Sequence, residues 1–281
     1  MSDSQQRVAI VTGAAGGIGQ ELVQALLVAG IRVAAVDRTA VGLAAVTAAA
    51  RTAGRDRALL TIEADLSYDT AIVDIIVQTR RRFGNIDILV NNAGIGQATL
   101  RPENWQRPIR FWEVGAEDWR RFVQVHTTVP MLLAQAVVPG MLDAKWGRIV
   151  NVTTSLGTMI RSGSPTYGPS KAALEALSAI MAKDLAGSGV TVNVLVPGGV
   201  TNTGMVPMQA GFDRQRMIQP AVMAAPLVWL VSDAAADVTG RRFLAVHWNP
   251  ALPTAEAAAM AGAPAAWESI ATMPIEPPRD G

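Results

Sequence analysis

The sequence of 281 residues predicts a single α/β domain built around one open, doubly wound sheet of parallel strands. Short apolar runs rich in β-branched residues alternate along the chain with longer segments of helical periodicity. These runs are continuously apolar, as in parallel strands that helices cover on both faces. Strict alternation of strands and helices, without an internal repeat or a linker, is typical of one doubly wound sheet.

The first strand and helix set the pattern for the rest of the chain. The run "RVAIVT" (7–12) predicts a strand, and "IGQELVQALLVAG" (18–30) predicts a helix that ends at Gly30. Further strands are predicted at 31–36, 58–64, 86–92, 147–153, 190–197 and 241–248. Further helices are predicted at about 40–53, 69–83, 117–141, 167–186 and 213–232.

Two segments interrupt this alternation. Residues 95–118 form a long connection with two tryptophans, one phenylalanine and three arginines. A connection of this length is usually functional or disordered, and its aromatic content argues against disorder. The tail from residue 249 is rich in Ala and Pro, and we expect either a docked helical arm or a loose end. The chain is therefore divided into a main domain, 1–248, and a C-terminal extension, 249–281.

Composition argues against several classes of function. Half of the residues are hydrophobic, 17% are charged and the net charge is +1, which gives no sign of electrostatic binding to nucleic acid or to an anionic membrane. Zero cysteines exclude disulfides and thiol catalysis, and two distant histidines argue against a His-based zinc site. The chain start lacks a signal-peptide pattern, and no stretch approaches 18 uninterrupted apolar residues. We expect a soluble, cytoplasmic protein without a metal.

A glycine-rich loop, "VTGAAGGIGQE" (11–21), follows the first strand and opens the first helix. Gly13, Gly17 and Gly19 let the backbone turn tightly and approach a ligand closely. The N–H groups of Ile18 and Gly19 can then face a pyrophosphate, helped by the helix dipole. A plain turn is the alternative, because the spacing is not the GxGxxG of the general dinucleotide fingerprint. The position between a strand and a helix near the chain start favours phosphate binding.

Asp37, at the end of the second strand, indicates which nicotinamide cofactor binds. A carboxylate there can accept hydrogen bonds from both hydroxyls of an adenosine ribose, and it repels a 2′-phosphate. Arg38 could instead pair with such a phosphate, and a turn or helix N-cap is the structural alternative for Asp37. Because no basic residue interrupts "GAAGGIG", we predict NAD, with NADP possible.

Five motifs together indicate a family. In order they are "TGAAGGIG" (12–19), "ADL" (64–66), "NNAG" (91–94), "YGPSK" (167–171) and "PGG" (197–199). In this order and spacing the chain resembles the short-chain dehydrogenase/reductases over about residues 7–247. The resemblance implies a Rossmann-type, seven-stranded parallel sheet, NAD(P) at the carboxyl ends of the strands, and usually a tetramer.

The resemblance also implies contacts with the cofactor. It implies that Asp65 and Leu66 flank the adenine, and that Asn92, Ala93 and Gly94 line the central part of the cofactor. It further implies that Pro197, Gly198, Val200 and Thr203 face the nicotinamide carboxamide, and that Lys171 holds the nicotinamide ribose beside Tyr167. The run "PGGVTNTGM" is one residue longer than the usual form, which leaves open which hydroxyl meets the carboxamide or phosphate.

Tyr167 and Lys171 lie four residues apart, on one face of a predicted helix. A lysine that merely extends past a half-buried phenol is the structural alternative. Removing hydride from an alcohol carbon requires a base near the hydroxyl, and a free tyrosine titrates near 10. An ammonium about 4 Å away contributes roughly 4 kcal/mol at an effective dielectric of 20, which could lower the phenol pKa by up to about three units, less the cost of desolvation. With the family resemblance, the pair is predicted to be catalytic, with Tyr167 as the acid–base.

The family usually has a serine thirteen residues before the tyrosine, which hydrogen-bonds the substrate oxygen. In this chain that position is Thr154, with Ser155 next along. A threonine hydroxyl donates and accepts as a serine does, although its methyl group narrows the pocket. Strand neighbours point to opposite faces, so only one of the two is expected to face the substrate, and the spacing favours Thr154.

The family commonly has an asparagine in the helix beside the active site, where this chain has His126 in "FVQVHTTVP" (122–130). That asparagine is thought to maintain a local distortion of the helix and a water that relays protons to the lysine. A histidine could relay protons itself, since its pKa lies in the required range. Packing at a helix position is the alternative, and both remain open here.

The leading functional prediction is an NAD(P)-dependent short-chain alcohol dehydrogenase or ketoreductase that acts on a small-molecule secondary alcohol or ketone. We expect a homo-oligomer, a tetramer or dimer, and no nucleic-acid or membrane partner. Enoyl reduction is disfavoured by the Tyr167–Lys171 spacing, and a catalytically inactive cofactor-binding or regulatory homologue is the alternative. A substrate pocket or lid, or else a subunit interface, is predicted from five side chains of the long connection: Trp105, Arg107, Arg110, Phe111 and Trp112.

Overall fold

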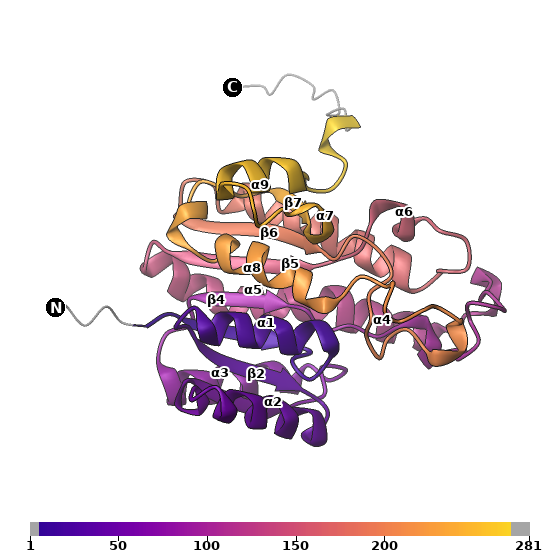
Figure 1. Ribbon diagram of the computed structural model, residues 1–281, viewed down its shortest axis with the longest axis horizontal. Coiled ribbons are helices and arrows are strands. Elements are labelled where there is room, and N and C mark those ends of the chain that lie inside the picture. Colours follow the sequence, from indigo (N-terminus) through magenta and orange to yellow (C-terminus); the bar gives the residue numbers. More distant parts are fainter. Residues whose placement is uncertain (1–5, 271–281) are drawn as a thin grey trace, which may run out of the picture.

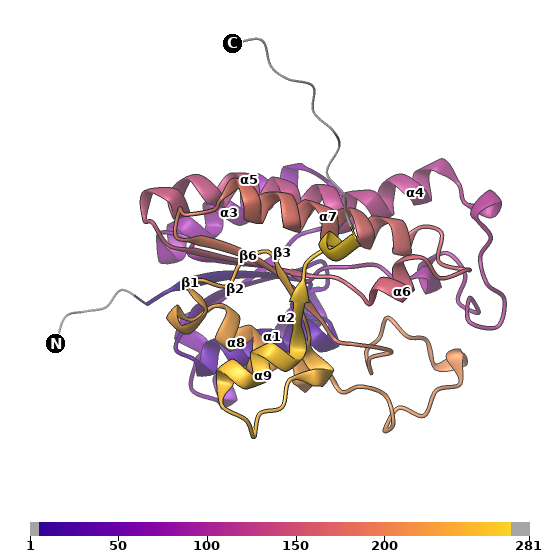
Figure 2. The same ribbon diagram turned by 90° about the horizontal axis from the view of Figure 1, so that it is seen from above.

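The computed structural model describes residues 6–270, which form one eight-stranded sheet between two layers of helices (Figures 1 and 2). The strands are β1 (Val8–Thr12), β2 (Arg32–Asp37), β3 (Leu59–Glu63), β4 (Ile88–Asn91), β5 (Gly147–Val152), β6 (Val190–Val196), β7 (Arg241–Leu244) and β8 (Gly262–Pro264). Their order across the sheet is β3-β2-β1-β4-β5-β6-β7-β8, and β1 to β7 run parallel. The predicted doubly wound α/β class is confirmed, with one strand more than the seven predicted.

Helices cover both faces of the sheet, which explains the continuously apolar strands. Figure 2 shows α1 (Gly17–Val28), α2 (Ala40–Thr52), α8 (Ala224–Leu230) and α9 (Thr254–Ala261) on one side, and α3 (Thr70–Phe83), α4 (Ala116–Val123), α5 (Val129–Asp143) and α7 (Tyr167–Asp184) on the other. Alternate side chains of β1 enter different cores. Ala9 and Val11 belong to the cluster under α1 and α8, whereas Ile10 belongs to the cluster under α3 and α5.

The chain adds strands on one side of β1 up to β3 and then continues on the other side with β4, so the strand order reverses between β1 and β4. Ligands of such sheets bind at the carboxyl ends of the strands next to this switch point. The connections that leave β4, β5 and β6 there are long, and they gather with the short helix α6 (Leu156–Met159) at one end of the molecule (Figure 1). The fold therefore places the glycine loop and the long connections at one edge.

The predicted helix at 117–141 contains a local irregularity. It consists of α4, a π-helical turn at Gln124–Thr128, and α5. The whole stretch, Ala116–Asp143, is long and apolar enough to cross a membrane by length and composition alone. However, its apolar side chains Leu133, Val137 and Met141 are buried in the core under α3 and α5, as in a core helix.

The prediction of a helix at 213–232 is wrong in its first half. Residues 213–219 form turns, a 3₁₀ turn follows at Pro220–Met223, and α8 begins only at Ala224. Pro220 disfavours a helical backbone at the residue before it, and Gln219 is extended, with φ −84° and ψ 139°. The last predicted strand is also shorter, because the chain after Leu244 forms a 3₁₀ turn, Ala245–His247.

The described part of the extension is a docked arm, the first of the two predicted possibilities. After α9 the chain forms β8, which pairs antiparallel with β7 through Arg242 and Ala263. Ala265, just beyond it, is 1% exposed. The extension therefore completes the sheet edge and continues the main domain, while its residues 271–281 lie outside the described residues.

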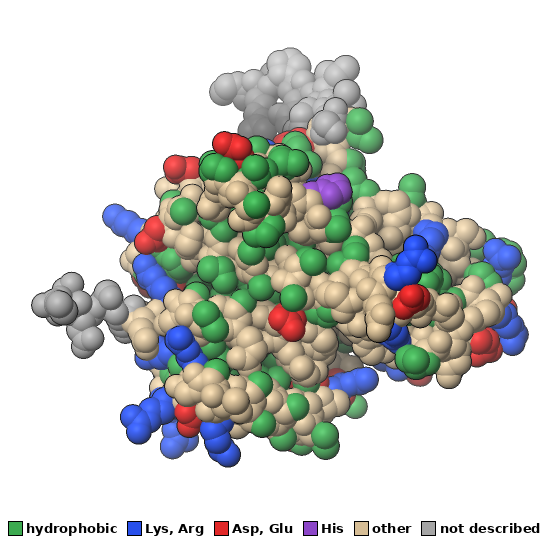
Figure 3. All heavy atoms as spheres, in the orientation of Figure 1, with side chains coloured by type: hydrophobic (Ala, Val, Ile, Leu, Met, Phe, Trp, Pro, Cys, Tyr) green, Lys and Arg blue, Asp and Glu red, His purple; other side chains and the backbone are tan. Residues whose placement is uncertain are grey.

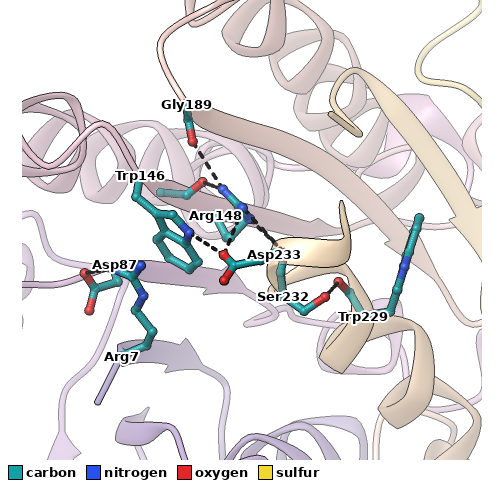
Figure 4. Close-up of polar contacts among 9 residues, drawn as sticks. Arg7, Asp87, Trp146, Arg148, Gly189, Trp229, Ser232 and Asp233 are labelled. Atoms are coloured by element: carbon teal, nitrogen blue, oxygen red, sulfur yellow. Dashed lines mark hydrogen bonds and ion pairs between the residues drawn. The ribbon is translucent and has the colours of Figure 1, made fainter. Parts of the chain in front are cut away.

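A buried arginine closes the opposite, amino-terminal end of β5 (Figure 4). The Arg148 guanidinium lies 4.2 Å from the centre of the Trp146 ring, and that of Arg7 lies 3.7 Å from it. Arg148 is 1% exposed and donates hydrogen bonds to the carbonyl oxygens of Gly147, Gly189 and Ser232. This cluster joins strands at the end far from the glycine loop, so its role is structural.

Candidate active site

Tyr167 and Lys171 lie in the first turns of α7, beside the carboxyl end of β5. Lys171 is 3% exposed, and its Nζ donates a hydrogen bond to the Val152 carbonyl oxygen at 2.8 Å. The Tyr167 ring packs edge-on against His126, with the ring centres 5.3 Å apart. The predicted pair is therefore assembled on one helix and held by burial and packing.

The protonation states of the pair differ from those that the spacing predicted. Burial raises the pKa of Tyr167 to about 12, although a side-chain hydrogen bond with Thr154 and the charge of Arg161 act in the opposite direction. Burial also lowers the pKa of Lys171 to about 7, so this lysine carries only a partial charge at neutral pH. The prediction that Lys171 brings the phenol pKa toward 7 is thus wrong for this structure. Tyr167 is held as a neutral phenol, which is a proton donor.

Three consecutive hydroxyl residues follow β5, and they have different surroundings. Thr153 is buried and donates its hydrogen bond to Glu175 Oε2 at 2.7 Å. The Thr154 side chain lies close to Tyr167, and its hydroxyl lowers the pKa of the phenol. Ser155 precedes α6, and its carbonyl oxygen accepts hydrogen bonds from the first turn of that helix. Thr154, which the spacing favoured, is therefore the hydroxyl beside the phenol.

His126 lies in the π-helical turn and is fully buried. Its Nε2 accepts a hydrogen bond from the Ile95 N–H at 2.9 Å, so the proton must be on Nδ1. Nδ1 donates to Ser170 Oγ at 2.8 Å, and that hydroxyl donates to the Tyr167 carbonyl oxygen at 3.0 Å. Burial, followed by the charge of Lys171, holds the pKa of His126 well below its usual range. Both ring nitrogens are occupied, which favours the packing alternative over a proton relay.

The neutral state of His126 should make the protein less stable in acid. Below pH 6.5 the unfolded chain binds a proton that folded His126 does not, so the free energy of unfolding should fall by up to about 1.4 kcal/mol per pH unit from this residue. Urea unfolding between pH 5 and 7 should show a shallower slope in His126→Asn than in wild type. The exposed His247→Asn is the control and should keep the wild-type slope; equal slopes in all three proteins would contradict the assignment.

The glycine loop fits a dinucleotide phosphate. Gly13 has φ +64°, and a side chain on it would lie 2.7 Å from the Ala93 backbone. A Cβ on Gly17 would lie 3.1 Å from the Thr203 methyl group. An open space of about 570 Å³ lies between Gly17 and the connection after β6, and Thr203 and Arg214 of that connection line it. The helix start thus presents N–H groups next to a space that a larger side chain would narrow.

Asn92 and Ala93 fasten the "NNAG" segment to the glycine loop. The Asn92 side-chain amide donates to the carbonyl oxygens of Thr12 and Gly13, both at 3.0 Å. The N–H groups of Asn92 and Ala93 donate to Thr12 Oγ1, and Gly94 follows against His126, where a Cβ would lie 3.1 Å from Nε2. These predicted cofactor residues therefore lie together and adjoin His126, which packs against Tyr167 of α7.

Asp37 already has partners within the chain. Its Oδ2 accepts a hydrogen bond from the Ala15 N–H at 3.0 Å, and its Oδ1 accepts from the N–H and hydroxyl of Thr39. The carboxylate therefore fastens the glycine loop to β2, as the turn alternative requires. Oδ1 thus accepts two hydrogen bonds and Oδ2 one, so one lone pair of Oδ2 is left to accept a hydrogen bond from a ligand. Arg38 beside it is exposed.

The remaining predicted cofactor residues lie after β3, after β6 and at the start of α1. Leu66 is buried, and Asp65 is exposed and accepts a hydrogen bond from the Ser67 N–H. After β6, the Pro197 carbonyl oxygen accepts from the Val246 N–H, and the Val200 carbonyl oxygen accepts from the Ile218 N–H. Gly198 has φ +109° in this turn. Ile18 and Gly19 lie in the first turn of α1, where Gly17 faces Thr203 and Gly19 lies against Gly13 and Ala14.

The long connection 95–118 packs against the two neighbouring connections. Gln97 donates to the Gly163 carbonyl oxygen at 2.8 Å, and the Gln106 amide donates to the Gln209 carbonyl oxygen. The Trp105 ring meets Phe212 edge-on, with the centres 4.8 Å apart. The three connections therefore form the rim of one site, here called the mouth (residues 92–115, 153–166 and 197–219).

The five aromatic and basic side chains predicted for a pocket differ in their surroundings. Trp105 packs on Phe212 of another connection, whereas Phe111 and Trp112 pack on each other and are 75% and 72% exposed. Arg107 forms an exposed ion pair with Glu103. Arg110 is exposed as well, with its guanidinium 3.5 Å from Ser162 Oγ. Two large aromatic side chains exposed side by side are typical of a surface that contacts another protein, so this pair favours the predicted subunit interface over the predicted pocket.

Sequence reasoning missed two residues that belong to the site region. Arg161 lies with its guanidinium 4.8 Å from the Trp105 ring centre, and its charge reaches Tyr167. Arg242 donates to the Thr154 carbonyl oxygen at 3.1 Å. A signal for the first existed, since Arg161 is the one charged residue between Thr154 and Tyr167 in the sequence. No such signal existed for Arg242, because its contact spans 88 residues.

Comparisons with known proteins agree with this geometry. Residues 7–211 match the family model described as short chain dehydrogenase. A 3-oxoacyl-[acyl-carrier-protein] reductase of Synechocystis sp. is 32% identical over 243 residues, which cover 84% of this chain and 94% of that protein. The cis-4-hydroxycyclohexanecarboxylate dehydrogenase of Sinomonas cyclohexanicum is also 32% identical over 243 residues, covering 84% and 93%.

A solved structure is similar over the same region. It is a Beutenbergia cavernae protein assigned as an NAD(P)-dependent gluconate 5-dehydrogenase, with NADP bound at low occupancy. The TM-score is 0.72 and the sequence identity 30%, and the match covers 85% of this chain and 94% of that one.

Proposed function

Because the chain belongs to the short-chain dehydrogenase/reductase family and is an NAD(P)-dependent oxidoreductase acting on an alcohol or ketone, we propose that Tyr167, Thr154 and Lys171 carry out its chemistry. The observation that carries this proposal is the neutral Tyr167 phenol, which lies beside the Thr154 hydroxyl and one helical turn from Lys171. The compared proteins are named for 3-oxoacyl-[acyl-carrier-protein], cis-4-hydroxycyclohexanecarboxylate and gluconate substrates, which supports a secondary alcohol or ketone as the reacting group.

In the reducing direction, the Tyr167 phenol donates its proton to the carbonyl oxygen of the substrate. A pKa of about 12 makes the phenol fully protonated at neutral pH, so the proton is available. The Thr154 hydroxyl positions the same substrate oxygen by a second hydrogen bond. A bound nicotinamide would supply the hydride to the carbonyl carbon.

Lys171 stabilises the tyrosinate that this proton transfer leaves behind. Its pKa of about 7 means that it gains or loses a proton readily near neutral pH. A negative phenolate one turn away favours the charged ammonium, and the ammonium in turn favours the phenolate. His126 acts through the backbone of this turn: its contact with Ser170 holds the first turn of α7, and its contact with Ile95 holds the segment after "NNAG".

We propose NAD(H) as the preferred cofactor. Asp37 supports this choice, because a 2′-phosphate placed beside its carboxylate would be repelled. NADP in the Beutenbergia protein and the exposed Arg38 support the alternative. A homo-oligomer and a cytoplasmic location remain predictions. A catalytically inactive cofactor-binding protein is not favoured, because Tyr167, Lys171 and a partner hydroxyl are all retained.

Replacing Asp37 tests the cofactor proposal. Wild type should bind NADH more tightly than NADPH in a titration of nicotinamide fluorescence. Asp37→Asn removes the charge but keeps the shape and an acceptor, so it should weaken NADH binding by roughly 10-fold and strengthen NADPH binding. Thr39→Val removes one partner of the carboxylate and should keep the NADH preference. Tighter binding of NADPH by wild type would reject the proposal and point to Arg38.

A further inference from the structure

Six arginines lie in the three connections of the mouth, and their partners differ. Figure 3 shows basic and acidic side chains together at this end of the molecule, where the three connections lie in Figure 1. The six are Arg101, Arg107, Arg110, Arg161, Arg214 and Arg216.

Three of these arginines already have ion-pair or hydrogen-bond partners within the chain. Arg101 and Glu113 form an ion pair at 3.3 Å, and Arg107 and Glu103 form a longer one at 3.9 Å. Arg214 donates hydrogen bonds to backbone carbonyl oxygens of its own connection. These guanidinium groups therefore already have partners that a ligand would have to displace.

Arg161 has a different environment. Among residues 6–270, no carboxylate forms an ion pair with it, and its guanidinium lies over the Trp105 ring at 4.8 Å from the centre. An indole that covers the face of a guanidinium leaves its N–H edge directed elsewhere. That edge is the part that binds a carboxylate through two parallel hydrogen bonds.

The position of Arg161 relates it to the reacting atoms. In the sequence it lies between Thr154 and Tyr167, on the connection that leads from β5 to α7; its side chain is exposed, and its positive charge lowers the pKa of Tyr167. Phe212 packs edge-on against the Trp105 ring, so the ring that covers the guanidinium is itself supported by a second aromatic side chain. A cation without an anionic partner thus borders an aromatic wall at the mouth of the catalytic site.

We propose that Arg161, backed by Trp105, binds the carboxylate of a hydroxy- or oxocarboxylic acid substrate, whose apolar body contacts Trp105 and Phe212. This inference rests on the proposed function, because it names the substrate class of the same site. A carboxylate matches the pair of parallel N–H donors that one guanidinium presents along an edge, whereas a phosphate dianion usually draws several cationic or N–H donors. Arg161 would act as a specificity-determining residue, which fixes one end of the substrate while Thr154 and Tyr167 hold the other.

Equilibrium binding of two simple ring compounds tests the proposal, whichever acid is the natural substrate. The NADH-saturated protein is titrated calorimetrically with cyclohexanecarboxylate and with cyclohexanecarboxamide, which has nearly the same shape but no charge. Wild type should prefer the carboxylate by roughly 10- to 100-fold, the range of a charge-assisted hydrogen bond. Arg161→Gln should remove this preference, Arg161→Lys should keep part of it, and Arg216→Gln, which deletes an exposed charge of the same mouth, should keep all of it.

Reduction of 4-oxocyclohexanecarboxylate and of its methyl ester supplies the second measurement. Arg161→Gln should lower kcat/KM for the acid mainly through KM, and it should lower kcat/KM for the ester by a much smaller factor, so that the ratio of acid to ester falls. Equal binding of the acid and the amide by wild type, or an equal loss in Arg161→Gln and Arg216→Gln, would overturn the inference. Failure to reduce both ketones despite NADH binding would count against the proposed function instead, while the calorimetric comparison would still decide the role of Arg161.

Discussion

Tyr167→Phe is expected to lower kcat for ketone reduction by about 10²- to 10⁴-fold, the usual contribution of a positioned general acid. The substitution removes only the phenol oxygen and leaves the ring against His126, where the centres are 5.3 Å apart. The hydride acceptor would then lack the phenol as its proton donor. Steady-state kinetics with the best substrate of a ketone screen would measure the loss.

The second tyrosine of the chain provides a matched control. Tyr68 is 66% exposed, and Tyr68→Phe removes the same atom at a position remote from α7. This variant should retain wild-type kcat, and both variants should bind NADH as wild type does. A Tyr167→Phe protein that keeps its rate, or loses NADH binding together with its rate, would rule out the acid role assigned to this phenol.

Breaking the Glu175–Arg242 pair should produce the largest loss of stability, about 3–5 kcal/mol in the free energy of unfolding. Arg242 Nε and Glu175 Oε1 are 2.9 Å apart, and the side chains are 6% and 0% exposed. The same carboxylate accepts hydrogen bonds from Thr153 and from the Ala266 N–H. Deleting either partner would leave an uncompensated charge in the interior, because no water can replace the lost contact.

Urea unfolding of Glu175→Gln and Arg242→Met would measure this loss, with Lys183→Gln as the control. Lys183 pairs with Glu268 at 3.1 Å, but both side chains are more than half exposed, so this pair should contribute only about 0–1 kcal/mol. Arg242→Met should also lower kcat, because Arg242 holds the Thr154 carbonyl oxygen. Stability losses as small as that of Lys183→Gln would show that the buried pair is replaceable.

The parallel sheet and its helices could be predicted from the sequence because their signals are local. A strand such as Val8–Thr12 is apolar at every position but its last, and burial of all five residues confirms the interpretation. The helix prediction was wrong where a single residue prevents the helix that the apolar periodicity indicates. Pro220 interrupts the apolar pattern of 213–232, and α8 begins only after it.

The state of the catalytic pair could not be predicted from spacing. The four-residue separation correctly placed Tyr167 and Lys171 on one helix, but the sign of the phenol pKa shift depends on how deeply both groups are buried. The tautomer of His126 likewise depends on Ile95 and Ser170, which are 31 and 44 residues away in the chain. Such long-range contacts leave no trace in local periodicity.

By itself, the sequence determined the doubly wound sheet, the glycine loop after its first strand and the Tyr167–Lys171 spacing, because each follows from neighbouring residues. Only the tertiary structure decided which groups meet across the mouth. Arg161, Trp105 and Phe212 come from three different connections, and they meet because β4, β5 and β6 end side by side at the same edge. The same holds for the docked extension, whose strand β8 forms only because β7 offers an unpaired edge.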